Sequence, residues 1–239
     1  METMKQIMYG VTDFARIRAE NGYFVDRTAL IRELEKTSYA MFLRPRRFGK
    51  SLLCSILQCY YDIDYAGRFE EFFGGLDIGR EPTAERGKYL FIDFNFTGVE
   101  KRIDRVQDSF NEYCSERLDV FVERQAGRLP EGTTAAVLAK RTCHEKFNTL
   151  TMRLKGSGLA LYITIDEYDN FTNTILAESR ESYEALCHGD GFFKQFFNEL
   201  KLATTGTDAP VTRLFVTGVT PVTMDDVTSG FNIASNISL

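Results

Sequence analysis

The segment that most constrains the fold is a basic stretch at residues 44–51, with the sequence Arg-Pro-Arg-Arg-Phe-Gly-Lys-Ser, between two apolar runs. The run at 39–43 favours a strand, and the apolar run at 52–57 favours a buried helix over 50–61. Strand, tight loop, Gly-Lys-Ser and helix form the layout of a phosphate-binding loop (Walker A). In such a loop, the backbone N–H groups of the loop and of the first helical turn point at an anion, and the helix dipole favours negative charge there. The segment therefore predicts a phosphate or nucleotide site.

The residues of this loop have distinct predicted roles. Gly49 lets the backbone approach a phosphate, Lys50 would reach the β- and γ-phosphates of ATP, and the Ser51 hydroxyl would bind Mg²⁺. Arg44 stands where the general pattern has its first Gly, and Pro45 pushes it towards an extended conformation. The predicted nucleotide-binding residues are Arg44, Pro45, Arg46, Arg47, Phe48, Gly49, Lys50, Ser51 and Leu52. A basic turn before a buried helix is the competing interpretation, so a second motif is needed.

A second motif (Walker B) follows the apolar-rich run at 159–165, which is typical of a strand buried on both faces. The run ends in Asp166 and Glu167, and open α/β sheets place ligands at the carboxyl ends of their strands. We predict that Asp166 holds Mg²⁺ and that Glu167 orients or deprotonates an attacking water. The alternatives are a helix N-cap for Asp166 and a turn residue for Asp169. Two motifs in this order favour a nucleoside triphosphatase.

Two further strands carry polar candidates. The aromatic-rich alternation at 89–96 predicts a strand, in which Asp93 is either an acid near the metal or, as we favour, a residue paired with a neighbour. The strand at 214–216 ends in Thr217, our choice for a residue that senses the γ-phosphate or the water, with Thr220 in reserve. The alternative is a hydroxyl that satisfies backbone groups at the strand end.

The remaining pattern predicts mostly helices. We expect a capped helix at about 28–35, irregular or short helical structure over 67–86, amphipathic helices over 103–122 and 143–154, and one or two helices over 181–203 interrupted at 189–191. The aromatic residues Phe14, Tyr23 and Phe24 could lie near a nucleotide base, although core packing is the favoured interpretation.

Composition excludes several classes of protein. The 239 residues carry 29 Lys+Arg against 34 Asp+Glu, a formal net charge of −5, which argues against a chain-wide footprint for nucleic acid. No apolar run approaches the ~20 residues of a membrane helix, and the N-terminus has no signal-peptide core. The five cysteines form no C-x-x-C pair, and two histidines give no zinc spacing. We expect a cytoplasmic protein with reduced thiols that pack in the core.

With these motifs in hand, the sequence resembles the prokaryotic AAA-ATPase-like family, whose members commonly carry a C-terminal domain of the PD-(D/E)XK nuclease superfamily. The resemblance covers most of the chain, and in this family the missing first Gly is usual. It rests on the stretches at 23–31, 44–52, 165–169, 216–219 and 230–233.

The resemblance implies a three-layer α/β/α P-loop NTPase fold with a mainly parallel sheet of the additional-strand type. It places the 213–217 strand between those at 39–43 and 159–165, with 89–96 outermost and a fifth strand on the other side. We expect one domain over 1–239, with an N-terminal segment and helix at 1–36 and a nucleotide-binding core at 37–239. The C-terminal lid would be missing from a truncated chain, which would leave a strand edge exposed.

Three functions remain open. The first is an ATPase that uses ATP and Mg²⁺, with Lys50, Glu167 and Thr217 as catalytic residues and Ser51 and Asp166 as metal ligands. Its energy would drive a conformational change coupled to a nucleic-acid-processing domain, and Arg46 or Arg47 would help in cis or as an arginine finger in a homo-oligomer. The second is a nucleotide-gated switch with little hydrolysis. The third is a nucleic-acid-binding module that uses the Arg-rich loop.

Overall fold

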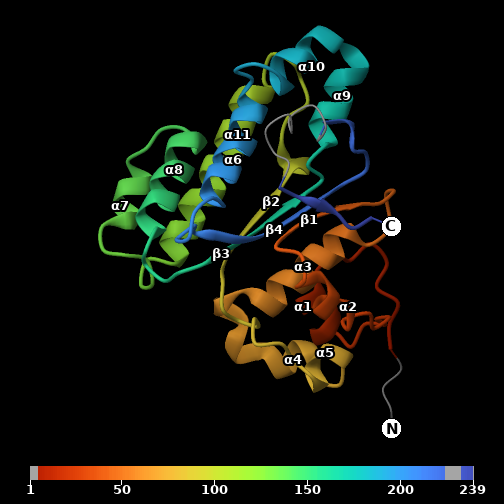
Figure 1. Ribbon diagram of the computed structural model, residues 1–239. Coiled ribbons are helices and arrows are strands. Elements are labelled where there is room, and N and C mark those ends of the chain that lie inside the picture. Colours follow the sequence, from red (N-terminus) through yellow and green to blue (C-terminus); the bar gives the residue numbers. More distant parts are fainter. Residues whose placement is uncertain (1–4, 224–232, 239) are drawn as a thin grey trace.

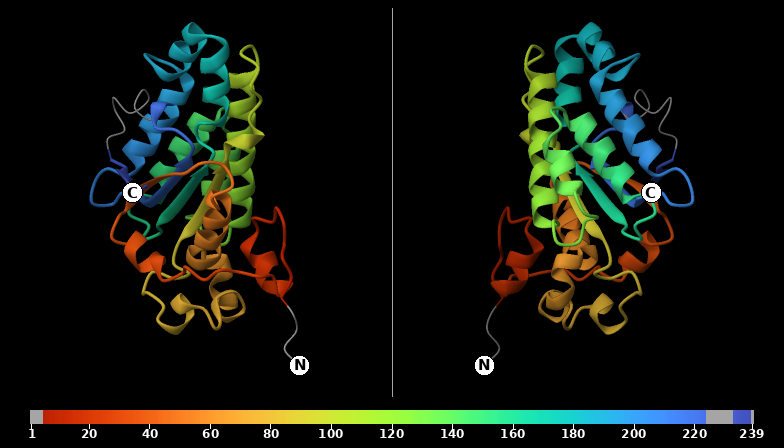
Figure 2. Two further views of the ribbon diagram at one scale, coloured as in Figure 1. Left: turned by 90° about the vertical axis from the view of Figure 1, so that its right-hand side faces the viewer. Right: turned by 90° about the vertical axis from the view of Figure 1, so that its left-hand side faces the viewer.

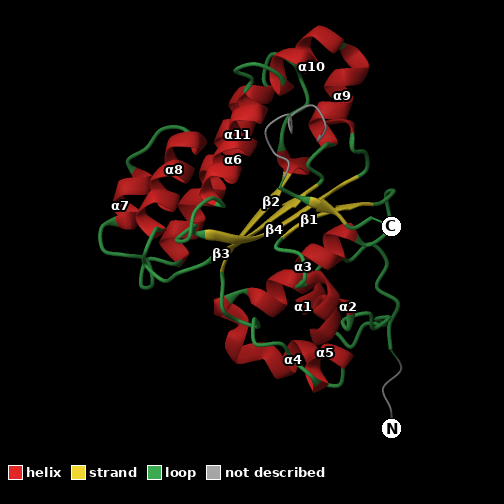
Figure 3. Cartoon of the chain, in the orientation of Figure 1, coloured by secondary structure: helices red, strands yellow, loops and turns green. Residues whose placement is uncertain are grey.

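A parallel sheet forms the centre of the computed structural model, which describes residues 5–223 and 233–238. Its strands stand in the order β2-β3-β4-β1-β5, and every pairing is parallel. Figure 1 shows the sheet between the two groups of helices. The bounds of the strands are β1 Tyr39–Leu43, β2 Leu90–Asn95, β3 Leu161–Asp166, β4 Val211–Gly218 and β5 Ser235–Asn236. Helices lie on both faces of the sheet (Figure 3), so the fold is the predicted three-layer α/β arrangement.

The strands alternate between two cores, because successive side chains of a strand point to opposite faces. Ile163 and Val216 belong to one core, whereas Tyr162 and Phe215 belong to the other. The six residues of β3 are all buried. This burial explains why the sequence at 159–165 is an almost continuous apolar run rather than an alternating one.

One helix layer consists of long amphipathic helices from the middle of the chain. Phe110, Phe147 and Phe196 come from three of them and pack in one core with Phe96. The elements of this layer and its connections are η2 Phe96–Gly98, α6 Val106–Arg124, α7 Thr133–Leu138, α8 Cys143–Leu154, α9 Asn170–Glu178, α10 Arg180–Cys187 and α11 Phe192–Ala203.

The opposite layer comes from the first third of the chain, and Figure 2 shows these red and orange helices apart from the green and blue ones. Tyr61 at the end of α3 stacks on Tyr162 of β3, with ring centroids 4.8 Å apart. The elements are α1 Phe14–Ala19, α2 Leu30–Leu34, α3 Lys50–Tyr61, η1 Ile63–Arg68, α4 Phe69–Phe73 and α5 Asp77–Arg80.

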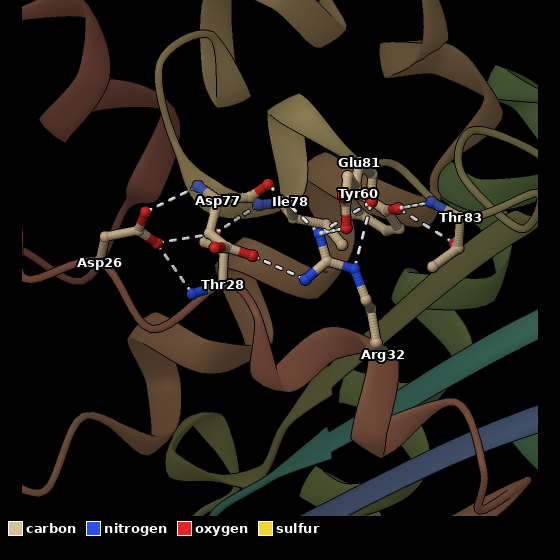
Figure 4. A network of polar contacts seen from close by, with 8 residues as sticks. All are labelled: Asp26, Thr28, Arg32, Tyr60, Asp77, Ile78, Glu81 and Thr83. Atoms are coloured by element: carbon tan, nitrogen blue, oxygen red, sulfur yellow. Dashed lines mark hydrogen bonds and ion pairs between the residues drawn. The ribbon is translucent and has the colours of Figure 1, made fainter.

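A polar network fixes the segment before α2 to this layer (Figure 4). Asp26 accepts hydrogen bonds from the backbone N–H groups of Thr28 and Asp77, and the Thr28 hydroxyl accepts one from the N–H of Ile78. Arg32 donates to the Asp77 carboxylate at 2.6 Å. The conspicuous Asp-Arg-Thr sequence at 26–28 thus satisfies the first N–H groups of α5.

Most predicted elements are confirmed. The strand at 39–43 and the helix at 50–61 have the predicted bounds, and the strand order is the one that the resemblance implies. The helix predicted at about 28–35 is α2, which begins at Leu30, and no side chain caps its N-terminus at Ala29, so the expected cap was wrong. Ile103 precedes α6 and is 42% exposed, so its inclusion in the helical pattern was wrong. The sequence patterns did not predict α1, α7 and α9.

The C-terminal part of the chain corrects one expectation. β5 pairs with Ala40 and Met41 of β1, so the strand edge expected to be exposed there is covered at these residues. Residues 230–232, part of the terminal stretch that carries the resemblance, lie outside the described residues. Within 5–223 and 233–238, no helix is both long and apolar enough to cross a membrane.

Candidate nucleotide site

The loop between β1 and α3 enters the helix through two residues with a left-handed backbone. Gly49 precedes the first residue of α3 with φ at 77°, in the left-handed region that favours glycine. A Cβ atom added at Gly49 would meet nothing within 4 Å, so the backbone angle, not space, requires the glycine. Arg47 also has a positive φ, at 70°. Arg46, Arg47 and Phe48 are exposed.

Lys50, in the predicted Walker A motif, contacts Glu167 of the predicted Walker B motif. Its side chain is almost fully buried, and the Nζ atom lies 3.3 Å from Oε1 of Glu167. Nζ also donates a hydrogen bond to the carbonyl of Pro45 at 3.4 Å. Glu167 follows β3 with φ at 53°, which ends the strand and turns the backbone. The ammonium group expected to meet phosphates is thus directly beside the proposed catalytic carboxylate.

Asp166 is the last residue of β3 and is 1% exposed. Its Oδ2 atom accepts a hydrogen bond from Nδ2 of Asn95 at 3.1 Å, whereas its buried Oδ1 atom has no partner among the described residues. Burial raises the pKa of this carboxyl to about 6, an effect that the nearby Ser51 hydroxyl partly offsets and the Glu167 charge reinforces. A buried carboxylate oxygen without a hydrogen-bond partner is suited to bind a cation.

Asn95 was not predicted as a site residue. Its register partner across the sheet is Asp166, so both side chains lie on one face at the carboxyl ends of β2 and β3. The sequence signal was present, since the predicted strand at 89–96 has a polar residue one position before its end, near the edge where ligands bind. In contrast, Asp93 accepts a hydrogen bond from the Thr164 hydroxyl at 2.6 Å, as the favoured interpretation of a paired strand residue predicted.

Thr217 and Thr220 differ in their surroundings. Thr217 is fully buried near the end of β4, and its hydroxyl oxygen has no hydrogen-bond partner within the described part of the chain. The hydroxyl of Thr220 donates to Asp169 Oδ2 at 3.2 Å. This difference favours Thr217 as the polar group free for a ligand and assigns Thr220 a structural contact.

The residues after Glu167 connect the ends of β3 and β4. The Asp169 carboxylate accepts hydrogen bonds from the backbone N–H groups of Val219 and Thr220, the latter at 2.8 Å. A side chain at Gly218 would overlap the ring of Tyr168 and the Asp169 carboxylate. Asp169 is therefore more than the turn residue of the alternative interpretation, because it fixes the segment that follows β4, directly after Thr217 and Gly218.

Arg44 points towards the C-terminal part of the chain. Its guanidinium lies 5.0 Å from the ring centroid of Phe42 and donates to the carbonyls of Leu43 and Ser238. These contacts lie beside β1 and β5. Arg44 therefore supports the start of the loop, and the contacts that the structure describes do not join it to Lys50.

The candidate metal ligands are too few to hold Mg²⁺ by themselves, but they fit the way in which enzymes bind Mg²⁺ together with a nucleotide. Among the described residues, no group of three or more His, Cys, Asp and Glu side chains is arranged to hold a metal ion. Mg²⁺ in such enzymes rests on one or two protein ligands together with phosphate oxygens and water. Ser51 and Asp166 could supply those protein ligands.

Comparison with known proteins agrees with this geometry. The family model described as "Predicted AAA-ATPase" matches residues 8–228, and the chain belongs to this AAA-ATPase-like family. The "Uncharacterized protein in vnfD 5'region" of Azotobacter chroococcum mcd 1 is 25% identical over 244 residues. The match covers 98% of this chain and 41% of that relative, so the chain spans less than half of the relative's length. Family membership supports nucleotide binding in general.

Proposed function

We propose that this chain binds ATP with Mg²⁺ and hydrolyses it to ADP and phosphate. One observation carries the proposal: buried polar groups without hydrogen-bond partners among the described residues lie at the carboxyl ends of β3 and β4, the edge of the sheet where the loop at 44–49 follows β1. The Oδ1 atom of Asp166 and the Oγ1 atom of Thr217 are both buried and unpartnered among the described residues. Such groups cost about 1–3 kcal/mol each unless a ligand or water satisfies them. A bound nucleotide would satisfy them.

Each residue has a role that follows from its position. Lys50 and the N–H groups at the start of α3 would bind phosphate oxygens, and Ser51 and Asp166 would hold Mg²⁺, which neutralises phosphate charge when bound. Glu167 would accept a proton from the attacking water or orient it. Thr217 would donate its hydroxyl hydrogen to a phosphate oxygen or to that water. Arg46 and Arg47 are exposed and could act on the same nucleotide or on one in a neighbouring copy.

The test is ATP binding by calorimetry with Mg²⁺, with phosphate release measured in the same samples. Lys50→Ala should abolish both signals. Lys146→Ala is a matched control, because Lys146 is also a buried lysine in an ion pair, with Asp119 of α6, in the helix layer on the other side of the sheet. The control variant should retain ATP binding even if its stability falls.

The outcomes separate the three functions. Binding that depends on Lys50, together with phosphate release, supports the ATPase. Binding without release supports a nucleotide-gated switch and contradicts hydrolysis by this chain. DNA affinity that falls steeply with salt and is independent of ATP supports a nucleic-acid-binding module. Wild-type protein that binds no ATP contradicts the proposal.

We further propose that residues 1–239 act as one nucleotide-binding domain. Two observations support this: the contacts of Asp26 and Thr28 join the segment before α2 to α5, and β5 adds residues 235–236 to the sheet. Conformational change in a nucleic-acid-processing domain, or in a homo-oligomer, is the proposed use of the hydrolysis energy. That step rests on the family resemblance.

A further inference from the structure

A cavity of about 360 Å³ lies in the helix layer formed by α6, α8 and α11. Its wall is aromatic, with Phe110, Phe147 and Phe196, and its rim is polar. Cys143 lines this cavity and keeps 8% of its surface accessible. None of the proposed nucleotide-site residues lines it, so its chemistry can be considered separately from the proposed ATPase.

A second thiol lies against Cys143. Cys114 on α6 is fully buried, and its thiol lies close enough to that of Cys143 for the two groups to shift each other's pKa. Asn111, one turn before Cys114 on the same face of α6, accepts a hydrogen bond from the backbone N–H of Cys143 at 2.7 Å. The first residue of α8 is therefore fixed against the part of α6 that carries Cys114.

The two thiols have unequal environments. Cys143 begins a 12-residue helix, where the helix dipole favours a thiolate, and the neighbouring Cys114 thiol lowers its pKa, helped by the backbone N–H of His144. Burial raises the pKa of Cys114 well above its usual value. Cys143 is thus the more nucleophilic and the more accessible thiol, and Cys114 is a neighbour placed to react second.

We propose that Cys114 and Cys143 form a redox site at which a hydroperoxide converts the two thiols into a disulfide between α6 and α8. The two cysteines of α3 do not offer this arrangement. Cys54 and Cys59 are buried on α3 in the opposite layer, and burial raises the pKa of both. The proposal concerns a second site and does not depend on nucleotide hydrolysis.

The chemistry takes place in two balanced steps. The Cys143 thiolate attacks one oxygen of hydrogen peroxide, the O–O bond breaks, and hydroxide leaves, so that the sulfur is oxidised to a sulfenic acid and the peroxide is reduced. The Cys114 sulfur then attacks the Cys143 sulfur as its own proton is lost. The S–S bond forms, the S–OH bond breaks, and the leaving hydroxide takes up that proton as water. Two thiols and one peroxide give one disulfide and two waters.

The test treats the folded chain with a small excess of hydrogen peroxide and maps its peptides without reduction by mass spectrometry. Wild type and the control Cys59→Ser should both yield a linked peptide pair that contains Cys114 and Cys143. Cys143→Ser should lose thiols at least about tenfold more slowly and form no such link. Cys114→Ala should stop at the sulfenic acid, which a cyclic diketone probe traps on Cys143.

Several results would overturn the proposal. One is wild-type protein in which Cys143 is converted to a sulfinic acid with no link to Cys114. Another is a disulfide that joins other cysteines in preference to this pair. Because Cys114→Ala leaves a space in the core, circular dichroism must show that the variant is folded. The wild-type peptide map tests the pairing even if that variant unfolds.

Discussion

The ammonium of Lys50 lies 3.3 Å from the Glu167 carboxylate, so the phosphate loop and the acidic end of β3 share one ion pair. Glu167→Gln should strengthen ATP binding by about tenfold, because it removes a negative charge near the phosphates and frees Lys50. The same substitution should slow phosphate release at least about 100-fold, since no base remains. Calorimetry and a phosphate-release assay measure the two effects.

Glu178→Gln at the exposed end of α9 is the control, and both of its parameters should equal those of wild type. Undiminished phosphate release in Glu167→Gln would exclude Glu167 as the base. Weaker binding would show that the carboxylate supports the site rather than competes for Lys50.

Asp166→Asn should stabilise the protein at neutral pH while it weakens Mg²⁺-dependent binding. The folded-state pKa of Asp166, about 6, exceeds its ordinary value of 3.8, so folding favours the protonated carboxyl. The contribution of this group to the free energy of unfolding is therefore complete below pH 3.8 and is lost as pH rises through about 6. The amide has no charge to desolvate. The free energy of unfolding of Asp166→Asn should therefore exceed that of wild type by about 1–3 kcal/mol above pH ~7, and this difference should shrink towards pH ~4.

Denaturant titrations across this pH range measure the effect. Asp104→Asn is the control, because Asp104 is exposed and paired with Arg102. That variant should show no comparable gain at neutral pH. A gain for Asp166→Asn that is independent of pH would mean that packing, not carboxylate burial, is responsible.

Thr217→Val should leave the stability of the protein unchanged or slightly higher, because the buried hydroxyl that it removes has no partner among the described residues. ATP turnover should nevertheless fall by about tenfold, since the hydroxyl is proposed to contact the nucleotide or water. Thr164→Val is the matched control on β3. Its hydroxyl donates to Asp93, so the variant should lose about 1–3 kcal/mol of stability. Normal turnover in Thr217→Val would exclude the proposed role.

Gly218→Ala should destabilise the fold by about 1–3 kcal/mol, because the added methyl group overlaps the Tyr168 ring and the Asp169 carboxylate. Thermal unfolding measures the loss. Gly127→Ala, at a position with open space and no positive φ, should change stability far less. Equal effects at the two positions would show that the contact between Gly218 and Tyr168 is not tight.

The sequence predicted the sheet well for a physical reason. Apolar runs such as 39–43 and 159–165 are long enough to be strands, and burial on both faces makes them stand out. Short helices were harder to predict. α1 has six residues, and its position depends on the hydrogen bond from the Phe14 N–H to the Ser55 hydroxyl, far away in the chain.

In the candidate site, too, features set by local sequence patterns were predicted, whereas features set by contacts between distant segments were not. The positions of Lys50 and Asp166 followed from strand-end motifs that act locally. The partner role of Asn95 depends on the register of β2 against β3, which no local pattern encodes. Likewise, the contacts of the Thr220 hydroxyl with Asp169 and Asn173 distinguish this residue from the buried Thr217, although the two threonines lie close together at the end of β4.

The positive φ of Arg47 has a consequence for how a ligand meets the loop. A left-handed backbone costs a residue other than glycine about 1 kcal/mol, and here the folded chain around it maintains that conformation. Part of the conformational entropy of the loop is therefore lost when the protein folds, not when a ligand arrives. An anion would dock on a surface that is already shaped, so selection at this loop would depend on geometry as well as on charge.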